Sequence, residues 1–241
     1  MFRRIPPFAM AVTGLVLCMT GTAVASWAGK DPASNFKLEL PSVCGANDEN
    51  AVGCVKAAVM TLDKARAHLG QPPYRLPTDF YSLTVNDQLF VLVNDDRTLY
   101  GLPPVPGVSP ELSHDAEGGV RNDSDPEPAD PDSVSFTSNW AAGNLNDIYA
   151  YLVWMYDDGP GKDGFNDDCK TRGASGCWGH RHNILWEFGR SQHLSMGVAH
   201  GADGKGTSDV GFAVLIVARL QPVEHNFTYT WKQALEHGAG N

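Results

Sequence analysis

The residues best suited to chemistry lie in one short run, residues 177–185, which reads Cys-Trp-Gly-His-Arg-His-Asn-Ile-Leu. Two imidazoles and a guanidinium there lead directly into an apolar pair. A solvent-exposed loop would gain nothing from the Ile-Leu pair. A core segment tolerates His-Arg-His only where each of these side chains has a hydrogen-bond or ion-pair partner. We therefore interpret the tryptophan and the Ile-Leu pair as anchors that hold polar groups in a fixed geometry. The run is the first candidate for a catalytic centre.

The neighbours of His180 in this run are assigned supporting roles. The Asn183 amide is expected to satisfy backbone groups at the turn before the apolar pair. Arg181 is expected either to pair with an acid such as Asp157 or Asp158, or to be a solvated surface residue. Four tryptophans are expected to form core and cleft wall, and two or three of them would also shape an apolar groove for a lipid, a sterol or a glycan ring. They are Trp140, Trp154, Trp178 and Trp186.

Residues 157–168 form a second candidate site, because this glycine-rich stretch supplies many carboxylate and carbonyl oxygens. Oxygen ligands of this kind are those that calcium prefers. The spacing differs from that of an EF-hand, since the D-x-D-x-D-G pattern and the terminal glutamate are missing. Two interpretations stay open: a calcium site, and a solvated acidic loop closed by a disulfide.

The first residues have the pattern of a Sec signal peptide. Arg3 and Arg4 precede an apolar run over residues 8–19, and Ala-Val-Ala at residues 23–25 gives a cleavage site before Ser26. The apolar run is shorter than the about 20 residues that a membrane-spanning helix needs, so an uncleaved anchor is only the alternative. We expect residues 1–25 to be removed and the mature protein to be secreted, with no stable membrane span.

Four cysteines remain after that cleavage, and an even number in an exported chain indicates two disulfides. The short spacings favour Cys44 with Cys54 and Cys169 with Cys177. Zinc ligation by all four is the alternative, although the chain contains no C-x-x-C pair.

The charge of the chain limits its partners. The formal net charge of −10 becomes −12 without residues 1–25, because that segment holds two arginines and no acids. Such an acidic surface argues against nucleic acid as a partner and against attraction to anionic membranes. It is compatible with binding cations.

Helices and strands are predicted to position these residues in an α+β fold. Apolar spacing and capping patterns predict helices over residues 47–69, 83–100, 109–121 and 145–157. Strands are expected over residues 134–136, 194–199 and 211–218, and the last is suited to the middle of a buried sheet. Helices followed by antiparallel strands indicate the α+β class. We divide the chain into an N-terminal extension with one bracing helix (26–80), a main domain (81–222) and a tail (223–241).

The order of elements and the central run resemble the CAP (SCP-like) superfamily of cysteine-rich secretory, antigen 5, pathogenesis-related and bacterial secreted proteins. Residues 91–97, Val-Leu-Val-Asn-Asp-Asp-Arg, and the following Gly-Leu-Pro at 101–103 are similar to its first-helix pattern, LVNxxR…GLxPL. Trp154 and the GHRHNIL run at 179–185 are similar to its signature W…GHRxNIL, and residues 194–199 resemble the GVG strand that follows. The likeness covers residues 83–220 and implies an α-β-α sandwich with a mainly antiparallel central sheet.

Many members of that family hold a divalent metal, often zinc, between two histidines and two acids in a cleft. The resemblance places His180 on the second histidine and Asp157 on the helix acid, while Ser138 stands where the other acid would be. Gly119 falls on the first histidine, and His114, five residues earlier, would have to reach in from another turn. Only two ligands of four thus remain, fewer than the about three protein ligands of a catalytic zinc site.

The sequence leaves three functional hypotheses open. The leading one is an extracellular binding module for a lipid, sterol, glycan or peptide, with no cofactor expected and zinc or calcium as alternatives. The second is a peptidase or esterase in which His180 works with Asp157 or Ser138, although no G-x-S-x-G elbow is present. The third is a structural extracellular protein whose cleft is vestigial. The alternative to a metal-binding role for His180 is a partly buried histidine, bonded through one ring nitrogen to a backbone carbonyl or to Asp157. The expected cleft residues are Ser138, Asn139, Trp140, Asp157, Trp178, His180 and Arg181.

Overall fold

A computed structural model of the chain describes residues 26–36, 41–44, 51–161, 166, 168–202, 204, 210–222 and 226–240. The predicted signal peptide lies outside the described residues. Among the helices that are described, none is both long and apolar enough to cross a membrane.

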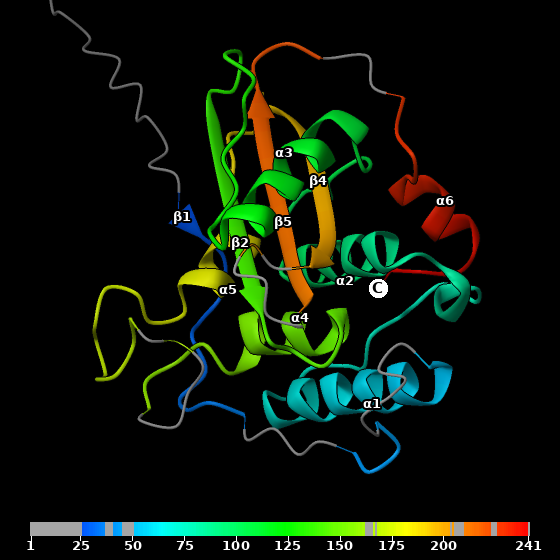
Figure 1. Cartoon of the computed structure of the whole chain (residues 1–241), viewed down its shortest axis with the longest axis vertical. Helices are drawn as coiled ribbons and strands as arrows, with labels where there is room; N and C mark the ends of the chain where they lie inside the picture. The colour runs from blue at the N-terminus through cyan, green and yellow to red at the C-terminus, as the bar shows by residue number, and fades with distance from the viewer. Residues whose placement is uncertain are drawn as a thin grey trace, which may run out of the picture.

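The centre of the fold is a three-stranded antiparallel sheet (Figure 1). Its strands are β2 (Ser135–Ala142), β4 (His193–Ala202) and β5 (Val210–Arg219), in the order β2-β5-β4. The predicted β-rich run therefore forms the middle strand, and nearly every residue of β5 is buried. Such a strand is buried because both of its faces are covered.

Helices cover both faces of this sheet. Helix α3 (Pro110–Asn122) lies on one face, where it closes a small apolar cluster with β4 and β5 (Figure 1). Gly197 on β4 permits this close approach, since a Cβ there would collide with the backbone carbonyl of Leu112. Helices α2 (Val85–Leu99), α4 (Asp147–Tyr156) and α5 (Gly179–Ile184) pack with the other face and with one another. The predicted α+β class is confirmed.

The helix ends follow the predicted sequence signals. The Ser109 hydroxyl accepts from the Leu112 N–H at 3.4 Å, and Pro110 occupies the first turn of α3, as predicted. Helix α1 (Val52–His68) ends before Gly70, whose φ of +71° is a backbone conformation that glycine adopts readily.

Two segments that sequence patterns left unstructured are ordered parts of the fold. In the predicted tail, α6 (Trp231–Glu236) inserts Trp231 and Ala234 into the main core. In the polar lead-in, β1 (Ser26–Trp27) pairs antiparallel with β3 (Trp186–Glu187). A further single turn, η1 (Phe80–Ser82), precedes α2. These elements are too short to produce a periodic pattern in the sequence, so only tertiary packing reveals them.

The predicted disulfides are both present, Cys44 with Cys54 and Cys169 with Cys177, at Cα–Cα distances of 4.8 and 4.6 Å. The first fixes the chain at the start of α1, and the second closes the loop before α5. Because all four sulfurs are in disulfides, the alternative of a four-cysteine zinc site is wrong.

A buried ion-pair network joins α1 to the rest of the core. The Arg66 guanidinium lies 2.7 Å from a carboxylate oxygen of Asp95 and 2.7 Å from one of Asp96, and all three side chains are fully buried. The hydroxyls of Tyr74 and Tyr151 both donate to Asp96 at 2.6 Å. The predicted bracing helix is thus tied to α2 by charge as well as by apolar contacts, and the predicted boundary at residue 80 does not separate two cores.

We expect the substitution Arg66→Met to destabilise the fold by about 3–5 kcal/mol, because it leaves two carboxylates buried without a counter-charge. Urea unfolding at pH 7, followed by tryptophan fluorescence, measures this loss. Arg121→Met is the control, since the Arg121 side chain is 59% exposed and its loss should change stability by less than about 0.5 kcal/mol.

The triple variant R66M/D95N/D96N separates charge from packing, because it removes the uncompensated carboxylates as well. It should regain part of the stability lost in R66M. Equal stability of R66M and R121M would contradict a central role for the network.

Candidate functional site

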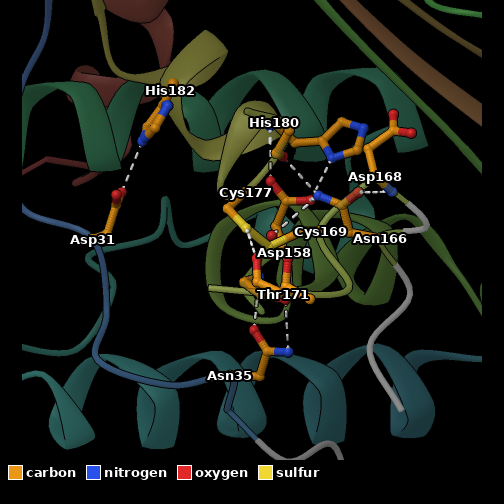
Figure 2. The surroundings of a disulfide bond; sticks show 12 residues. Asp31, Asn35, Asp158, Asn166, Asp168, Cys169, Thr171, Cys177, His180 and His182 are labelled. Carbon is orange, nitrogen blue, oxygen red and sulfur yellow. Dashed lines mark hydrogen bonds and ion pairs between the residues drawn. A yellow bond between two sulfur atoms is a disulfide. The ribbon is translucent and has the colours of Figure 1, made fainter. Parts of the chain in front are cut away.

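His180 is held by Asp158 and not by Asp157, which corrects the predicted pairing. Its ring Nδ1 lies 2.7 Å from Asp158 Oδ1, and its backbone N–H donates to Asp158 Oδ2 at 2.9 Å (Figure 2). The imidazole is 28% exposed, so it is partly buried as predicted. Helix α4 ends at Tyr156 and Asp157 adopts a non-helical C-cap conformation, which turns the chain so that the next carboxylate faces α5.

Asp158 organises the loop around His180. The Asn166 amide donates to Asp158 Oδ1 at 2.7 Å, to the Asp158 carbonyl at 3.1 Å and to the Gly176 carbonyl at 2.9 Å. The Asp158 carbonyl also accepts from the Trp178 N–H at 2.9 Å. Trp178 has a φ of 60°, a left-handed conformation that is uncommon for residues other than glycine. The Cys169–Cys177 disulfide lies directly beside this cluster, as Figure 2 shows, and the strained turn places His180 at the start of α5.

The electrostatic environment of His180 is acidic. Burial alone would lower its pKa, but the hydrogen bond and charge of Asp158, with the charges of Asp125 and Asp168, raise it above 6.5. Burial, with the neighbouring charge of Asp158, raises the pKa of Asp157 to about 6. Desolvation of the Asp125 carboxyl also raises its pKa, although the residue as a whole is exposed. The charge of His180 opposes this shift. The charges of three carboxylates, those of Asp158, Asp125 and Asp168, therefore act on one imidazole.

Side-chain amides join α5 to the edge strand β2. The Asn183 amide donates to the Ser138 carbonyl at 2.7 Å and to Asn139 Oδ1 at 3.0 Å. In turn the Asn139 amide donates to the His180 carbonyl at 2.9 Å, and the Thr137 hydroxyl donates to the Asn183 carbonyl at 2.9 Å. The Asn183 amide therefore bonds to a backbone carbonyl of β2 and not to the turn before the apolar pair, where its role was predicted, and Asn139 ties β2 to the start of α5.

Arg181 has neither of the two predicted positions. Its side chain is fully buried, and it donates to the Met155 carbonyl at 2.9 Å and to the Tyr100 hydroxyl. The guanidinium carbon lies 5.3 Å from the Tyr100 ring centroid and 5.8 Å from that of Tyr156. The predicted pair with Asp157 or Asp158 and the alternative of a solvated arginine are both wrong, since the cation is accommodated by carbonyl and aromatic partners.

Ser138 lies on the opposite face of β2 from Asn139. Its register partner on β5 is Leu215, whose side chain packs under α3, whereas Asn139 faces α5. No hydrogen bond between the Ser138 hydroxyl and His180 is present among the described residues. A Ser-His-Asp triad of Ser138, His180 and Asp157 is therefore not assembled in this conformation.

The structure does not complete a metal tetrad within the residues it describes. His114 is 76% exposed on α3, where it lies 3.3 Å from Glu117 instead of entering the cleft. At Gly119 a side chain would meet Ser124 and Pro126, so no larger residue fits there. No group of three or more His, Cys, Asp or Glu side chains is arranged for a metal in the described part of the chain. Residues 162–165 and 167 of the predicted calcium loop lie outside that part.

The four tryptophans pack in or against the apolar core, which confirms the core part of their predicted role. Trp178 is 3% exposed and its ring packs so closely on Gly159 that a Cβ there would collide with it. Trp154 is fully buried and its indole N–H donates to the Trp140 carbonyl at 3.4 Å. Trp140 packs against the α3 cluster, and Trp186 against the main core.

His182 has partners in the N-terminal segment that sequence patterns did not reveal. Its ring stacks on Trp27 at a centroid distance of 4.2 Å, and its Nε2 lies 2.8 Å from Asp31 Oδ1. Asn35 exchanges two hydrogen bonds with the Gly159 backbone, at 2.7 and 3.1 Å (Figure 2). A tryptophan within an otherwise polar lead-in was the one available signal for this packing.

We expect His180→Gln to destabilise the protein more at pH 5–6 than above pH 8. The folded-state pKa of His180 is raised, so its stabilisation is fully present below about pH 6.5 and is lost as the pH rises through the folded value. A loss of about 1–2 kcal/mol at pH 5.5, shrinking toward alkaline pH, should appear in urea unfolding curves.

His114→Gln serves as the matched control for that experiment, because His114 is an exposed histidine whose removal should cost less than about 0.5 kcal/mol. A pH-independent loss in H180Q would show that the Asp158 pair contributes packing and not charge.

Comparison of the chain with protein-family models, with curated proteins and with solved structures found no match. The resemblance to the CAP superfamily remains a prediction, and it rests on the GHRHNIL run, the first-helix pattern and the order of the elements.

Proposed function

We propose that this protein is a secreted, CAP-like domain that acts as an extracellular binding module. A signal-peptide pattern, two disulfides and helices on both faces of an antiparallel sheet support this proposal. In this proposal, the GHRHNIL run fixes the shape of a binding surface. The cleft, which keeps only two of the four metal ligands of the family, exposes that surface to a ligand.

The observation that carries the proposal is that the polar groups of this run bond to the protein itself. Asp158 holds His180, Arg181 is buried on Met155 and Tyr100, and the Asn183 amide bonds to β2. Side chains that are bonded within the protein can hold a binding surface in its shape and need not take part in a catalytic cycle. The exposed part of this site is acidic, because Asp125 and Asp168 are exposed and their charges, with that of buried Asp158, act on the imidazole.

Among the expected ligand classes, a peptide with basic side chains matches this charge. We expect a fluorescein-labelled, lysine-rich nonapeptide to bind the mature protein at low salt, and a glutamate-rich peptide of the same length not to bind. The double variant D125N/D168N should weaken binding at least threefold, measured by fluorescence anisotropy.

Glu236→Gln is the control for that variant, because Glu236 is an exposed acid on α6 whose loss changes the net charge away from the cleft. An equal effect of E236Q and D125N/D168N would mean that the peptide responds to overall charge only, and the binding proposal for this cleft would be wrong.

A second candidate function, an extracellular hydrolase, is favoured by one contact. Asp158 holds Nδ1 of His180, which leaves Nε2 as the ring nitrogen able to accept a substrate proton. If p-nitrophenyl acetate or a peptide substrate is turned over, H180Q should lower kcat by about 100-fold or more. An unchanged rate in both H180Q and S138A would exclude this function.

A further inference from the structure

A pocket of about 270 Å³, which His180 does not line, lies at the end of the sheet where β4 begins and β5 ends. It contains the side chains of Arg97, Arg190 and Arg219, from three separate parts of the chain. No aspartate or glutamate lines it among the described residues. In a protein whose formal net charge is −10, three cations around one pocket are a concentration of positive charge.

Arg97 is a fully buried cation bound only to neutral oxygens in the described structure. Its Nε donates to the Pro103 carbonyl at 3.1 Å, and its Nη1 donates to the carbonyls of Ile184 and Trp186 at 2.9 and 3.1 Å. Its Nη2 has no hydrogen-bond partner. Burial lowers the pKa of Arg97 to about 10. A buried guanidinium without a carboxylate is unfavourable unless an anion compensates it.

Arg219 carries a second buried, unpartnered donor beside the same pocket. It is 2% exposed, and its Nε lies 2.5 Å from Asp130 Oδ2. Its Nη1 has no hydrogen-bond partner. Arg190, in contrast, is exposed and stands at the rim with His193. Arg66 and Arg181 also carry unpaired N–H groups, but they do not line this pocket.

The rest of the pocket wall combines apolar residues with the polar residues Gln192, His193, Ser195 and Gln221. Phe188 and Leu194 are buried in it, and three prolines of the segment after α2 complete one side, namely Pro103, Pro104 and Pro106. The pocket volume of about 270 Å³ is sufficient for one small ring with an anionic group.

We propose that this pocket binds a small organic anion, a carboxylate carried on an apolar ring, whose oxygens pair with the guanidinium groups of Arg97 and Arg219 in the pocket wall. Arginine suits this role because its planar fork matches a carboxylate. Phe188, Leu194 and the prolines receive the ring, and Arg190 adds charge at the entrance. The carboxylate belongs either to a free small molecule or to the last residue of a peptide chain. This pocket is separate from the cleft of the proposed function, so the two proposals stand or fall independently.

Isothermal titration calorimetry of the mature protein with benzoate and with benzamide tests the proposal, because the two probes differ in charge and hardly in shape. Benzoate should bind with a Kd of about 1 mM or tighter, at least tenfold tighter than benzamide. Titration with Gly-Gly-Phe and with its C-terminal amide shows whether a peptide end binds as well. Stronger binding of either acid than of its own amide supports the proposal and identifies the source of the carboxylate.

Variants link the binding to the pocket. R219Q should weaken the affinity for the acid that binds at least tenfold, and R190Q, which alters only an exposed side chain, should weaken it about threefold. R121Q, an exposed arginine on α3, should leave it unchanged. Absence of binding by both acids at 20 mM, equal binding of each acid and its amide, or full affinity in R190Q and in folded R219Q would overturn the proposal.

Discussion

The burial of Arg66 between two carboxylates is the constraint on which the arrangement of the helices depends. One guanidinium contacts Asp95 and Asp96 at 2.7 Å, its carbon lies 3.3 Å from the Tyr74 ring centroid, and two tyrosine hydroxyls donate to Asp96. Burial and the charge of Asp96 raise the pKa of Asp95 to about 6 even though Arg66 opposes the shift. A buried cluster of this kind tolerates little displacement, because separating any member leaves a charge in an apolar medium. It therefore fixes α1, α2 and α4 relative to one another, and α4 leads directly to Asp158.

Most of the fold follows from periodic patterns, and the parts that do not are short or charged. The long helices, the central strand and the disulfide pairing were predictable because each rests on spacing or parity along the chain. Arg66 and Asp96 were missed although each falls on an apolar stripe, one turn after Leu62 and three residues after Val93, where a charge requires a partner. A charged residue in such a stripe therefore indicates a buried ion pair, but the sequence does not identify the partner.

The candidate site was predictable in its location but not in its bonding. The GHRHNIL run pointed to His180, yet the choice between two adjacent aspartates depends on where α4 ends, and helix ends are uncertain by one or two residues. Because Asp157 is the C-cap, Asp158 is the residue that reaches α5. In the same way, the register of β2 decides on which face of the sheet the Ser138 side chain lies, since a shift of one residue moves a side chain to the other face. Similarly, Trp27 in the polar lead-in is a signal for packing, but nothing local identifies His182, more than 150 positions away, as the partner of Trp27 and Asp31.

Helix α5 is held at both ends by groups that belong to different sites. Asp158 accepts from the backbone N–H of His180 near its N-terminal end, and Arg97 donates to the carbonyl of Ile184 at its C-terminal end. Six residues are too few for a helix to be stable alone, so these contacts and the amide bonds to β2 keep it folded. Arg97 also lines the pocket beyond that end. An anion bound beside Arg97 would therefore balance the positive charge of the same guanidinium that holds the C-terminal end of α5. Arg97 is thus shared by the pocket wall and the C-terminal end of α5, whereas His180 lies near the other end of that helix.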